Sequence, residues 1–233
     1  MALDSFPAGY RALVIGASGA IGAAFVQQLG ADAGCGAVHG LHRQSSPAID
    51  FADEASIASA AAAVAALGPF HLILNAAGVL HSAGTLPEKK LGDLHYAQLL
   101  ATFQANTFGP ALVLRHFSPL LDAQRGVLVM LSAKVGSIGD NRLGGWYSYR
   151  ASKAALNMLV KTAAIELKRS KPAAVLVALH PGTVASKLSR PFKGDQIGRP
   201  ASRAAAEMLA VINRLTPDDS GSFVSHDGQA LPW

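Results

Sequence analysis

Short apolar runs alternate along this chain with longer stretches of helical character. The apolar runs each predict a strand and lie at 11–15, 37–41, 48–50, 70–74, 126–131, 174–179 and 222–225. The helical stretches lie at 20–29, 54–67, 94–121, 147–167 and 200–215. Because nearly continuous apolar strands alternate with helices, the pattern predicts a parallel sheet covered on both faces.

One domain accounts for the whole pattern. The chain has 233 residues and contains no repeat, long linker or low-complexity tail beyond an alanine-rich helix. We therefore expect residues 1–233 to form a single doubly wound α/β domain of Rossmann type. Within the stretch 94–121, Gly109 and Pro110 are expected to kink the helix.

Composition narrows the possible partners. Hydrophobic residues make up 50% of the chain and charged residues 15%, which indicates a folded protein. The formal charge of +5 suits a phosphorylated ligand, but no block of basic residues favours nucleic acid. The eight histidines show no metal-ligand spacing, so no metal is expected.

Cysteine usage and hydropathy bear on the compartment. Cys35 is the single cysteine, which excludes an intrachain disulfide and favours a reducing compartment. The N-terminus lacks the basic and apolar regions of a signal peptide. The longest apolar stretch, 57–67, is too short to span a membrane. We expect a cytoplasmic protein that does not insert into membranes.

A glycine-rich turn follows the first predicted strand and opens the first helix. It reads Gly16-Ala-Ser-Gly19-Ala-Ile-Gly22. Glycines allow close approach of the backbone to a pyrophosphate, and the helix N-terminus supplies free amide donors. The turn therefore predicts a dinucleotide site, although a plain tight turn into a helix has the same pattern.

The second predicted strand distinguishes between the two nicotinamide nucleotides. It ends in Leu41-His42-Arg43, and no acidic residue lies between Arg43 and Asp50. An acid at this position binds the ribose of NAD, whereas an arginine suits the 2′-phosphate of NADP. The sequence favours NADP(H) over NAD(H), with His42 near the ribose by position. A solvated Arg43 is the alternative.

Tyr149 and Lys153 lie four residues apart, which places them on one face of a helix. A positive charge about 4 Å away, at an effective dielectric constant of about 20, is worth on the order of 4 kcal/mol. That energy corresponds to about 3 pKa units, enough to prepare a tyrosine for acid/base catalysis near neutral pH. Tyr147 projects from a different face.

Further motifs, in order and suitably spaced, resemble those of the short-chain dehydrogenase/reductase family over nearly the whole chain. They are Asp50-Phe51, Asn75-Ala-Ala-Gly78, Asn106, the Tyr149/Lys153 pair and Pro181-Gly182-Thr-Val184. The segments 136–138, 144–150 and 227–233 resemble the C-factor and sniffer-like carbonyl reductase branch. Some members of that branch are associated with cell–cell signalling.

The resemblance implies an NADP(H)-dependent oxidoreductase that interconverts a small carbonyl compound and an alcohol. Tyr149 would be the acid/base, Lys153 its partner, and Asn106 the support of a proton-relay water. It also implies a homodimer or homotetramer formed through the helices at 94–121 and 147–167. The implied cofactor contacts are Gly16, Ser18, Gly19, Ala20, Ile21, Gly22, His42, Arg43, Asp50, Phe51, Asn75, Ala76, Ala77, Gly78, Ser132, Tyr149, Lys153, Pro181, Gly182 and Val184.

Two positions depart from the family pattern. Ala20 replaces a glycine common in the first turn, and Ala133 stands where the family has a serine that donates to the substrate oxygen. Loss of one such donor typically costs on the order of 10²–10³ in rate. Ser132 and Ser137 are the nearest candidate replacements.

Two alternative functions stay open, and so does the role of one loop. The absence of a serine at Ala133 favours a nucleotide-binding signalling or sensor protein with little turnover. A nucleotide-sugar epimerase shares the glycine pattern and the Tyr/Lys pair, but the chain is short for one. The loop 185–199 contains Lys187, Arg190, Lys193 and Arg199. It is expected either to attract an acidic or phosphorylated substrate or to form a solvated lid.

Overall fold

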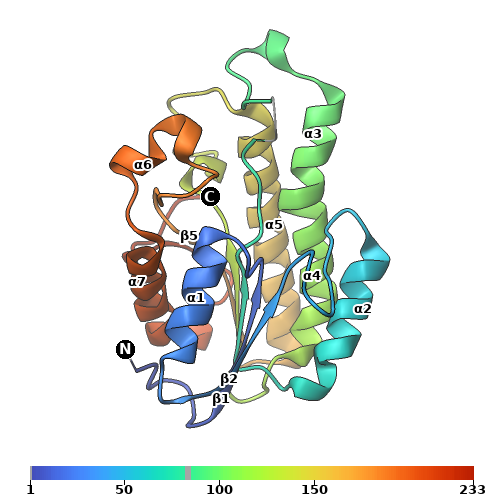
Figure 1. The fold of residues 1–233 in the computed structure, drawn as a ribbon, viewed down its shortest axis with the longest axis vertical. Coiled ribbons are helices and arrows are strands. Elements are labelled where there is room, and N and C mark those ends of the chain that lie inside the picture. The colour runs from blue at the N-terminus through green and yellow to red at the C-terminus, as the bar shows by residue number, and fades with distance from the viewer. Residues whose placement is uncertain (1, 82–84) are drawn as a thin grey trace.

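The computed structural model describes residues 2–81 and 85–233 (Figure 1). All the strands are parallel and form a six-stranded sheet in the order β2-β1-β3-β4-β5-β6. They are β1 Tyr10–Ile15, β2 Cys35–Leu41, β3 Leu72–Asn75, β4 Val127–Leu131, β5 Val175–His180 and β6 Phe223–Ser225. The predicted α/β fold with one parallel sheet is confirmed.

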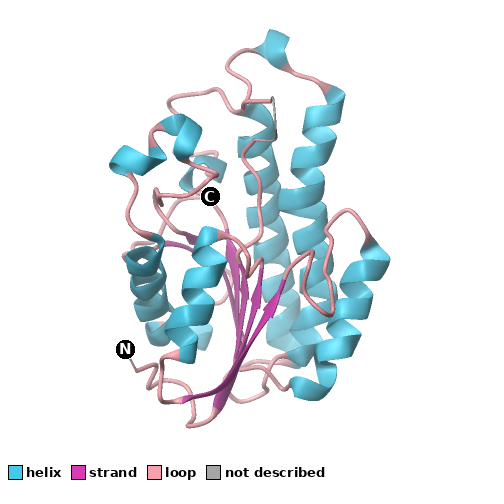
Figure 2. Ribbon diagram, in the orientation of Figure 1, coloured by secondary structure: helices cyan, strands magenta, loops and turns pink. Residues whose placement is uncertain are grey.

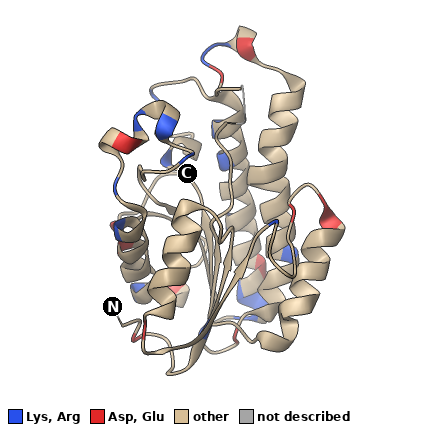
Figure 3. Ribbon diagram, viewed as in Figure 1, with Lys and Arg blue, Asp and Glu red and all other residues tan. Residues whose placement is uncertain are grey.

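Helices cover both faces of the sheet, as Figure 2 shows. They are α1 Ala20–Gly30, α2 Glu54–Val64, α3 Tyr96–Phe103, α4 Gly109–Phe117, α5 Tyr147–Ser170, α6 Gly194–Ile197 and α7 Ala201–Arg214. α1 and α7 pack on one face, and α2, α4 and α5 pack on the other. In the view of Figure 3, acidic and basic residues are interspersed over the helices and loops.

The continuous apolar runs are explained by burial on both faces. Successive strand residues point to opposite faces. In β4, Val127 and Val129 join the core beneath α1 and α7, whereas Leu128 and Met130 join the core beneath α5. All four side chains are fully buried. The central strands therefore present an apolar residue at every position.

The predicted strand at 48–50 is wrong. Its backbone bonds locally instead of to a neighbouring strand: the Ile49 N–H donates to the His42 carbonyl at 3.2 Å, and the Asp50 N–H donates to the Ser56 hydroxyl at 2.9 Å. Ile49 is buried nonetheless. One apolar side chain anchors this segment without a strand partner.

The helix predicted at 94–121 is divided into α3, a π-helical turn at Gln104–Phe108, and α4. The helical path continues through Gly109 and Pro110, and the irregularity is the π turn before them. Proline is tolerated in a first helical turn, where its missing N–H is not needed.

Within residues 2–81 and 85–233, no helix combines the length and apolar character needed to cross a membrane.

Candidate active site

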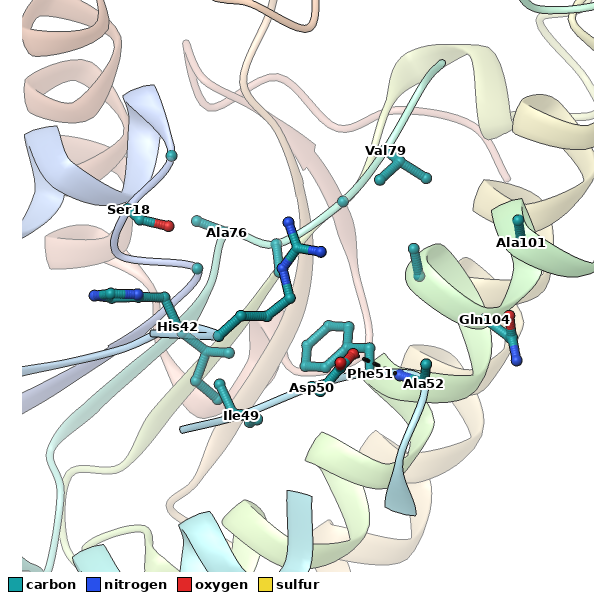
Figure 4. A pocket seen from close by; sticks show the side chains of 17 residues that line it. Ser18, His42, Ile49, Asp50, Phe51, Ala52, Ala76, Val79, Ala101 and Gln104 are labelled. Atoms are coloured by element: carbon teal, nitrogen blue, oxygen red, sulfur yellow. Dashed lines mark hydrogen bonds between the residues drawn. The ribbon is translucent and has the colours of Figure 1, made fainter. Parts of the chain in front are cut away.

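A cavity of about 410 Å³ lies at the carboxyl ends of β1, β2 and β3 (Figure 4). β1 lies between the other two strands, so the chain reverses its direction of winding at this point. Open α/β sheets bind ligands in such a crevice. Ten residues predicted to contact the cofactor line it: Gly16, Ser18, Gly19, His42, Arg43, Asp50, Phe51, Ala76, Ala77 and Gly78.

The glycine-rich turn forms one wall of the cavity and fits a pyrophosphate. Gly16 has φ +83°, and a Cβ there would lie 2.6 Å from the Ala77 nitrogen. α1 begins after Gly19 with no side-chain cap and no acidic residue in its first turn. The first amide groups of an uncapped helix are available to an anion.

A tight turn after β2 places His42 and Arg43 at the cavity. The His42 N–H donates to the Ser45 hydroxyl, and that hydroxyl also contacts the His42 carbonyl, both at 2.8 Å. Arg43 is exposed and forms no salt bridge among the residues that the structure describes. Its guanidinium is therefore available to an anionic ligand.

Several lining residues were not predicted: Ile15, Ile49, Ala52, Val79, Ala101, Gln104 and Ala105. Figure 4 shows Ala101 and Gln104 along the helix that faces the turn of Asp50, Phe51 and Ala52. Positions 101, 104 and 105 have the three- and four-residue spacing of one helix face. That spacing could have identified them in the sequence.

Tyr149 and Lys153 lie in the first two turns of α5 and are both buried, with exposed fractions of 9% and 4%. The Lys153 ammonium donates to the Leu131 carbonyl at 3.0 Å and lies 5.9 Å from the centre of the Tyr149 ring. The structure therefore brings the two residues together on one face, at the carboxyl end of β4.

Burial shifts the pKa values of this pair in opposite directions. It raises the pKa of Tyr149 to about 12 and lowers the pKa of Lys153 to about 8. The sequence predicts a lowered tyrosine pKa beside the lysine, whereas removal of the phenol from water shifts it upward. At neutral pH, Tyr149 holds its proton.

Asn106 lies in the π turn and is fully buried. Its Oδ1 accepts from the Val79 N–H at 2.9 Å, and its Nδ2 donates to the Val79 carbonyl at 2.8 Å. A Cβ placed on Gly78 would lie 3.2 Å from Asn106 Oδ1 and 3.5 Å from Lys153 Nζ. Asn106, Lys153 and the wall of the cavity therefore meet at Gly78.

The two serines nearest to Ala133 in the sequence both bond to other parts of the protein. The Ser132 hydroxyl is buried and donates to Asn157 Oδ1 at 2.6 Å, so it points toward α5 rather than into the cavity. The Ser137 hydroxyl is also buried and donates to the Trp233 carbonyl at 3.2 Å. Both hydroxyl protons are thus donated to acceptors within the protein.

Other predicted cofactor residues lie outside the lining of the cavity. Asn75 is buried, where its Oδ1 accepts from the Ala77 N–H at 3.2 Å, so it holds the turn that lines the site. The Pro181 carbonyl, after β5, accepts from Arg199 at 2.5 Å. The other predicted cofactor residues outside the lining are Ala20, Ile21, Gly22, Ser132, Tyr149, Lys153, Gly182 and Val184.

The segment 185–199 covers the tyrosine with apolar side chains. Leu188 and Phe192 pack on a cluster formed by Leu80, Ala133 and Tyr149. The Phe192 ring lies 4.8 Å from the Trp146 ring. The surroundings of the tyrosine are thus hydrophobic.

Two of the four basic residues in this segment are already paired. Arg190 bonds Asp195 at 3.1 Å, and Arg199 pairs with Glu207. These pairs disfavour the acidic-substrate interpretation of the loop.

Residues 10–196 match the model of the short chain dehydrogenase family. The chain is 35% identical to 1-hydroxy-2-glutathionyl-2-methyl-3-butene dehydrogenase of Rhodococcus sp. (strain AD45), over 80% of this chain and 79% of that protein. It is 36% identical to the C-signal protein of Myxococcus xanthus, over 71% of this chain and 94% of that protein.

The fold is similar to that of solved carbonyl reductases. The NADPH-bound carbonyl reductase from chicken fatty liver superposes with a TM-score of 0.83 at 25% identity, over 98% of this chain and 96% of that one. The carbonyl reductase Sniffer of D. melanogaster superposes with a TM-score of 0.82 at 22% identity, over 96% and 99% of the two chains.

Proposed function

Because the chain belongs to the short chain dehydrogenase family and is thus an NAD(P)-dependent oxidoreductase, we propose that it interconverts a carbonyl compound and an alcohol, with NADP(H) as cofactor and Tyr149 as the acid/base. One observation carries the proposal: the ammonium of the buried Lys153 lies beside Gly78, which lines the cavity, and 5.9 Å from the ring centre of the buried Tyr149. A module that only binds a nucleotide does not need this pair.

When bound, the nicotinamide supplies or accepts the hydride. In the reductive direction, Tyr149 holds a proton at its hydroxyl and donates it to the carbonyl oxygen of the substrate. Lys153, held by the Leu131 carbonyl, places a positive charge beside the tyrosine as the proton leaves. Asn106 holds the backbone at Val79 and supports the water that returns a proton. The apolar surroundings keep bulk water from the reacting groups.

The test of the acid/base is Tyr149→Phe, with Tyr147→Phe on the same helix as the matched control. NADPH binding is measured by fluorescence titration, and turnover by NADPH oxidation with a panel of carbonyl compounds. We expect Tyr149→Phe to keep cofactor affinity and to lose about 10²–10⁴ in kcat. Equal activity in Tyr149→Phe and wild type would contradict the proposed role.

The preference for NADP(H) rests on Arg43, which lines the cavity without a salt-bridge partner among the described residues. A charge-assisted hydrogen bond is worth about 1.5–3 kcal/mol. Arg43→Ala should therefore weaken NADPH binding about 10- to 100-fold and leave NADH binding unchanged. Arg169→Ala, an exposed arginine in the last turn of α5, is the control. Equal weakening of both cofactors would contradict a contact with the 2′-phosphate.

A second candidate is a nucleotide-binding sensor with little turnover, favoured by Ala133 and by the engagement of both nearby serines. Ala133→Ser separates the two functions. If the protein is an enzyme, the wild type turns over a carbonyl compound, and Ala133→Ser raises kcat only modestly. A sensor binds NADPH without turnover, and only Ala133→Ser becomes an active reductase.

The proposed assembly is a homodimer or homotetramer that joins through α4 and α5. A groove of about 610 Å³ lies between these helices. Two apolar side chains of α5, Met158 and Ile165, are 67% and 55% exposed. Light scattering on wild type and on Ile165→Glu tests this: a monomeric wild type would contradict the assembly, and dissociation of the variant would support it.

A further inference from the structure

The first turn of α5 has no local cap. The residue before the helix, Trp146, makes no side-chain capping bond and has a left-handed backbone with φ +52°. Helices usually satisfy their first N–H groups with a side chain from this position. The helix that carries Tyr149 and Lys153 therefore needs another acceptor at its N-terminus.

Glu88, 60 residues earlier in the chain, supplies that acceptor. Its carboxylate accepts from the Ser148 N–H at 3.2 Å and from the Ser148 hydroxyl at 2.6 Å. Its backbone carbonyl accepts from the Trp146 N–H at 2.5 Å. Three hydrogen bonds to Glu88 thus hold Trp146 and Ser148, the residues on either side of the first helical position.

The contact is buried on both sides. Glu88 and Ser148 are each 2% exposed. Among the described residues, no lysine, arginine or histidine forms a salt bridge with Glu88. A buried carboxylate needs compensation, and the positive end of the 24-residue helix α5 provides it. The helix terminus and the carboxylate therefore stabilise each other.

The segment that carries Glu88 is itself anchored. The Leu86 carbonyl accepts from Gln98 of α3 at 3.0 Å, and Asp93 accepts from the N–H groups of Lys89 and Lys90 at 3.0 and 3.2 Å. α3 leads directly into the π turn that carries Asn106. Glu88 thus connects the helix of Asn106 to the helix of Tyr149.

Resting on the proposed function, we propose that Glu88, acting through Ser148, is the positioning residue that fixes the first turn of α5 and so the direction of the Tyr149 hydroxyl. Tyr149 follows Ser148 directly and lies in the turn where an uncapped helix frays. Release of this turn moves the hydroxyl without touching the nucleotide cavity. A displacement of about 1 Å in a catalytic group can cost on the order of 100-fold in rate.

Glu88→Ala is the first test variant, and Glu54→Ala is its control. Glu54 is 60% exposed and pairs with Arg115 on the surface, so its loss should change little. We expect Glu88→Ala to lower kcat about 10- to 100-fold. KM for the carbonyl and Kd for NADPH should stay within about twofold of wild type, because the substrate and nucleotide contacts remain.

Glu88→Gln provides the conservative rescue. A glutamine amide can accept from the Ser148 N–H and donate to the Ser148 hydroxyl, so kcat should return to within about threefold of wild type. A kcat in Glu88→Gln as low as in Glu88→Ala would overturn positioning by these hydrogen bonds. If Glu88→Ala does not fold, Ser148→Ala replaces it, with an expected loss of about 3- to 10-fold in kcat.

Hydrogen exchange separates the failure of this inference from the failure of the proposed function. Amides in the peptide 147–153 should exchange at least 10-fold faster in Glu88→Ala than in wild type, with or without a known substrate. Unchanged exchange, or an unchanged kcat in Glu88→Ala while Tyr149→Phe is inactive, would overturn the role of Glu88 alone. Unchanged kcat in Tyr149→Phe would overturn the proposed function, whereas the exchange result would still decide whether Glu88 holds the helix.

Discussion

Two regions at the carboxyl edge of the sheet, here called the nucleotide half and the reaction half of the site, differ in exposure and in polarity. The nucleotide half, at β1 to β3, is an open cavity with a free helix N-terminus and an unpaired arginine among the described residues. The reaction half, at β4 and α5, is buried beneath Leu188 and Phe192. A phosphate needs exposed donors, whereas proton transfer benefits from exclusion of water.

The two halves also differ in how the chain builds them. Three nearly contiguous segments, 15–19, 42–52 and 76–79, supply most of the nucleotide lining. The reaction half depends on contacts between distant residues: Asn106 with Val79, Lys153 with Leu131, and Glu88 with Ser148. The nucleotide half is therefore built from short segments at the ends of adjacent strands, whereas the reaction half depends on single side-chain contacts between distant residues.

Gly16→Ala is expected to have the largest effect, because it damages the nucleotide half at its most confined point. The new Cβ would lie 2.6 Å from the Ala77 nitrogen, at a backbone φ of +83°. Left-handed strain and overpacking together should cost roughly 2–5 kcal/mol of unfolding free energy. NADPH affinity should fall by a factor on the order of 100 or more. Urea denaturation and fluorescence titration measure the two losses.

Gly9→Ala is the matched control, since Gly9 has φ +79° but no atom within 4 Å of the added Cβ. It should lose only about 1–2 kcal/mol and bind NADPH normally. If Gly16→Ala behaves like Gly9→Ala in both measurements, the close approach at Ala77 does not shape the nucleotide site.

The predictability of the site follows the same division. The glycine turn, His42 and Arg43 could be placed from the sequence because each motif directly follows a strand end. Strand periodicity failed at 48–50, where a single buried Ile49 resembles a strand but has no partner. Short apolar runs do not distinguish a paired strand from an anchored loop.

In the reaction half, the spacing of Tyr149 and Lys153 predicted proximity but not the sign of the tyrosine pKa shift. That sign depends on burial of the phenol, to which Leu188 and Phe192 contribute from a segment about 40 residues further along the chain. The π turn around Asn106 was hidden for a related reason. Its sequence is ordinary for a helix, and Gly109 with Pro110 suggested the wrong site of irregularity.

Lys153→Met tests whether the reaction half is as dry as its burial indicates. Burial lowers the pKa of Lys153 from 10.5 to about 8, so below pH 8 the lysine is charged in both states and its burial cost is complete. Above pH 8 the folded state releases the proton first, and the unfolded state then binds more protons. Stability of wild type relative to Lys153→Met should therefore rise with pH, by roughly 2 kcal/mol between pH 7 and 9.5.

Urea denaturation at several pH values measures this difference. The pH series should end below pH 10. Between pH 10 and 12, the raised pKa of Tyr149 gives the folded state more protons than the unfolded state, which lowers stability as pH rises. Lys168→Met, an exposed lysine on the same helix, controls for loss of charge. A pH-independent difference between wild type and Lys153→Met would mean that water reaches the ammonium in the folded protein.

Phe192→Ala should have the smallest effect, because it thins the apolar cover of the reaction half without touching a reacting group. Its ring lies 4.8 Å from Trp146 and 6.1 Å from His81, and an aromatic pair contributes about 0.5–1.5 kcal/mol. We expect kcat/KM for carbonyl reduction to fall about 2- to 10-fold, while the Kd for NADPH stays constant. Phe192→Leu keeps an apolar cover, so its kcat/KM should lie between those of wild type and Phe192→Ala. If Phe192→Ala weakens NADPH binding as much as it slows turnover, the two halves share this wall and the division between them fails.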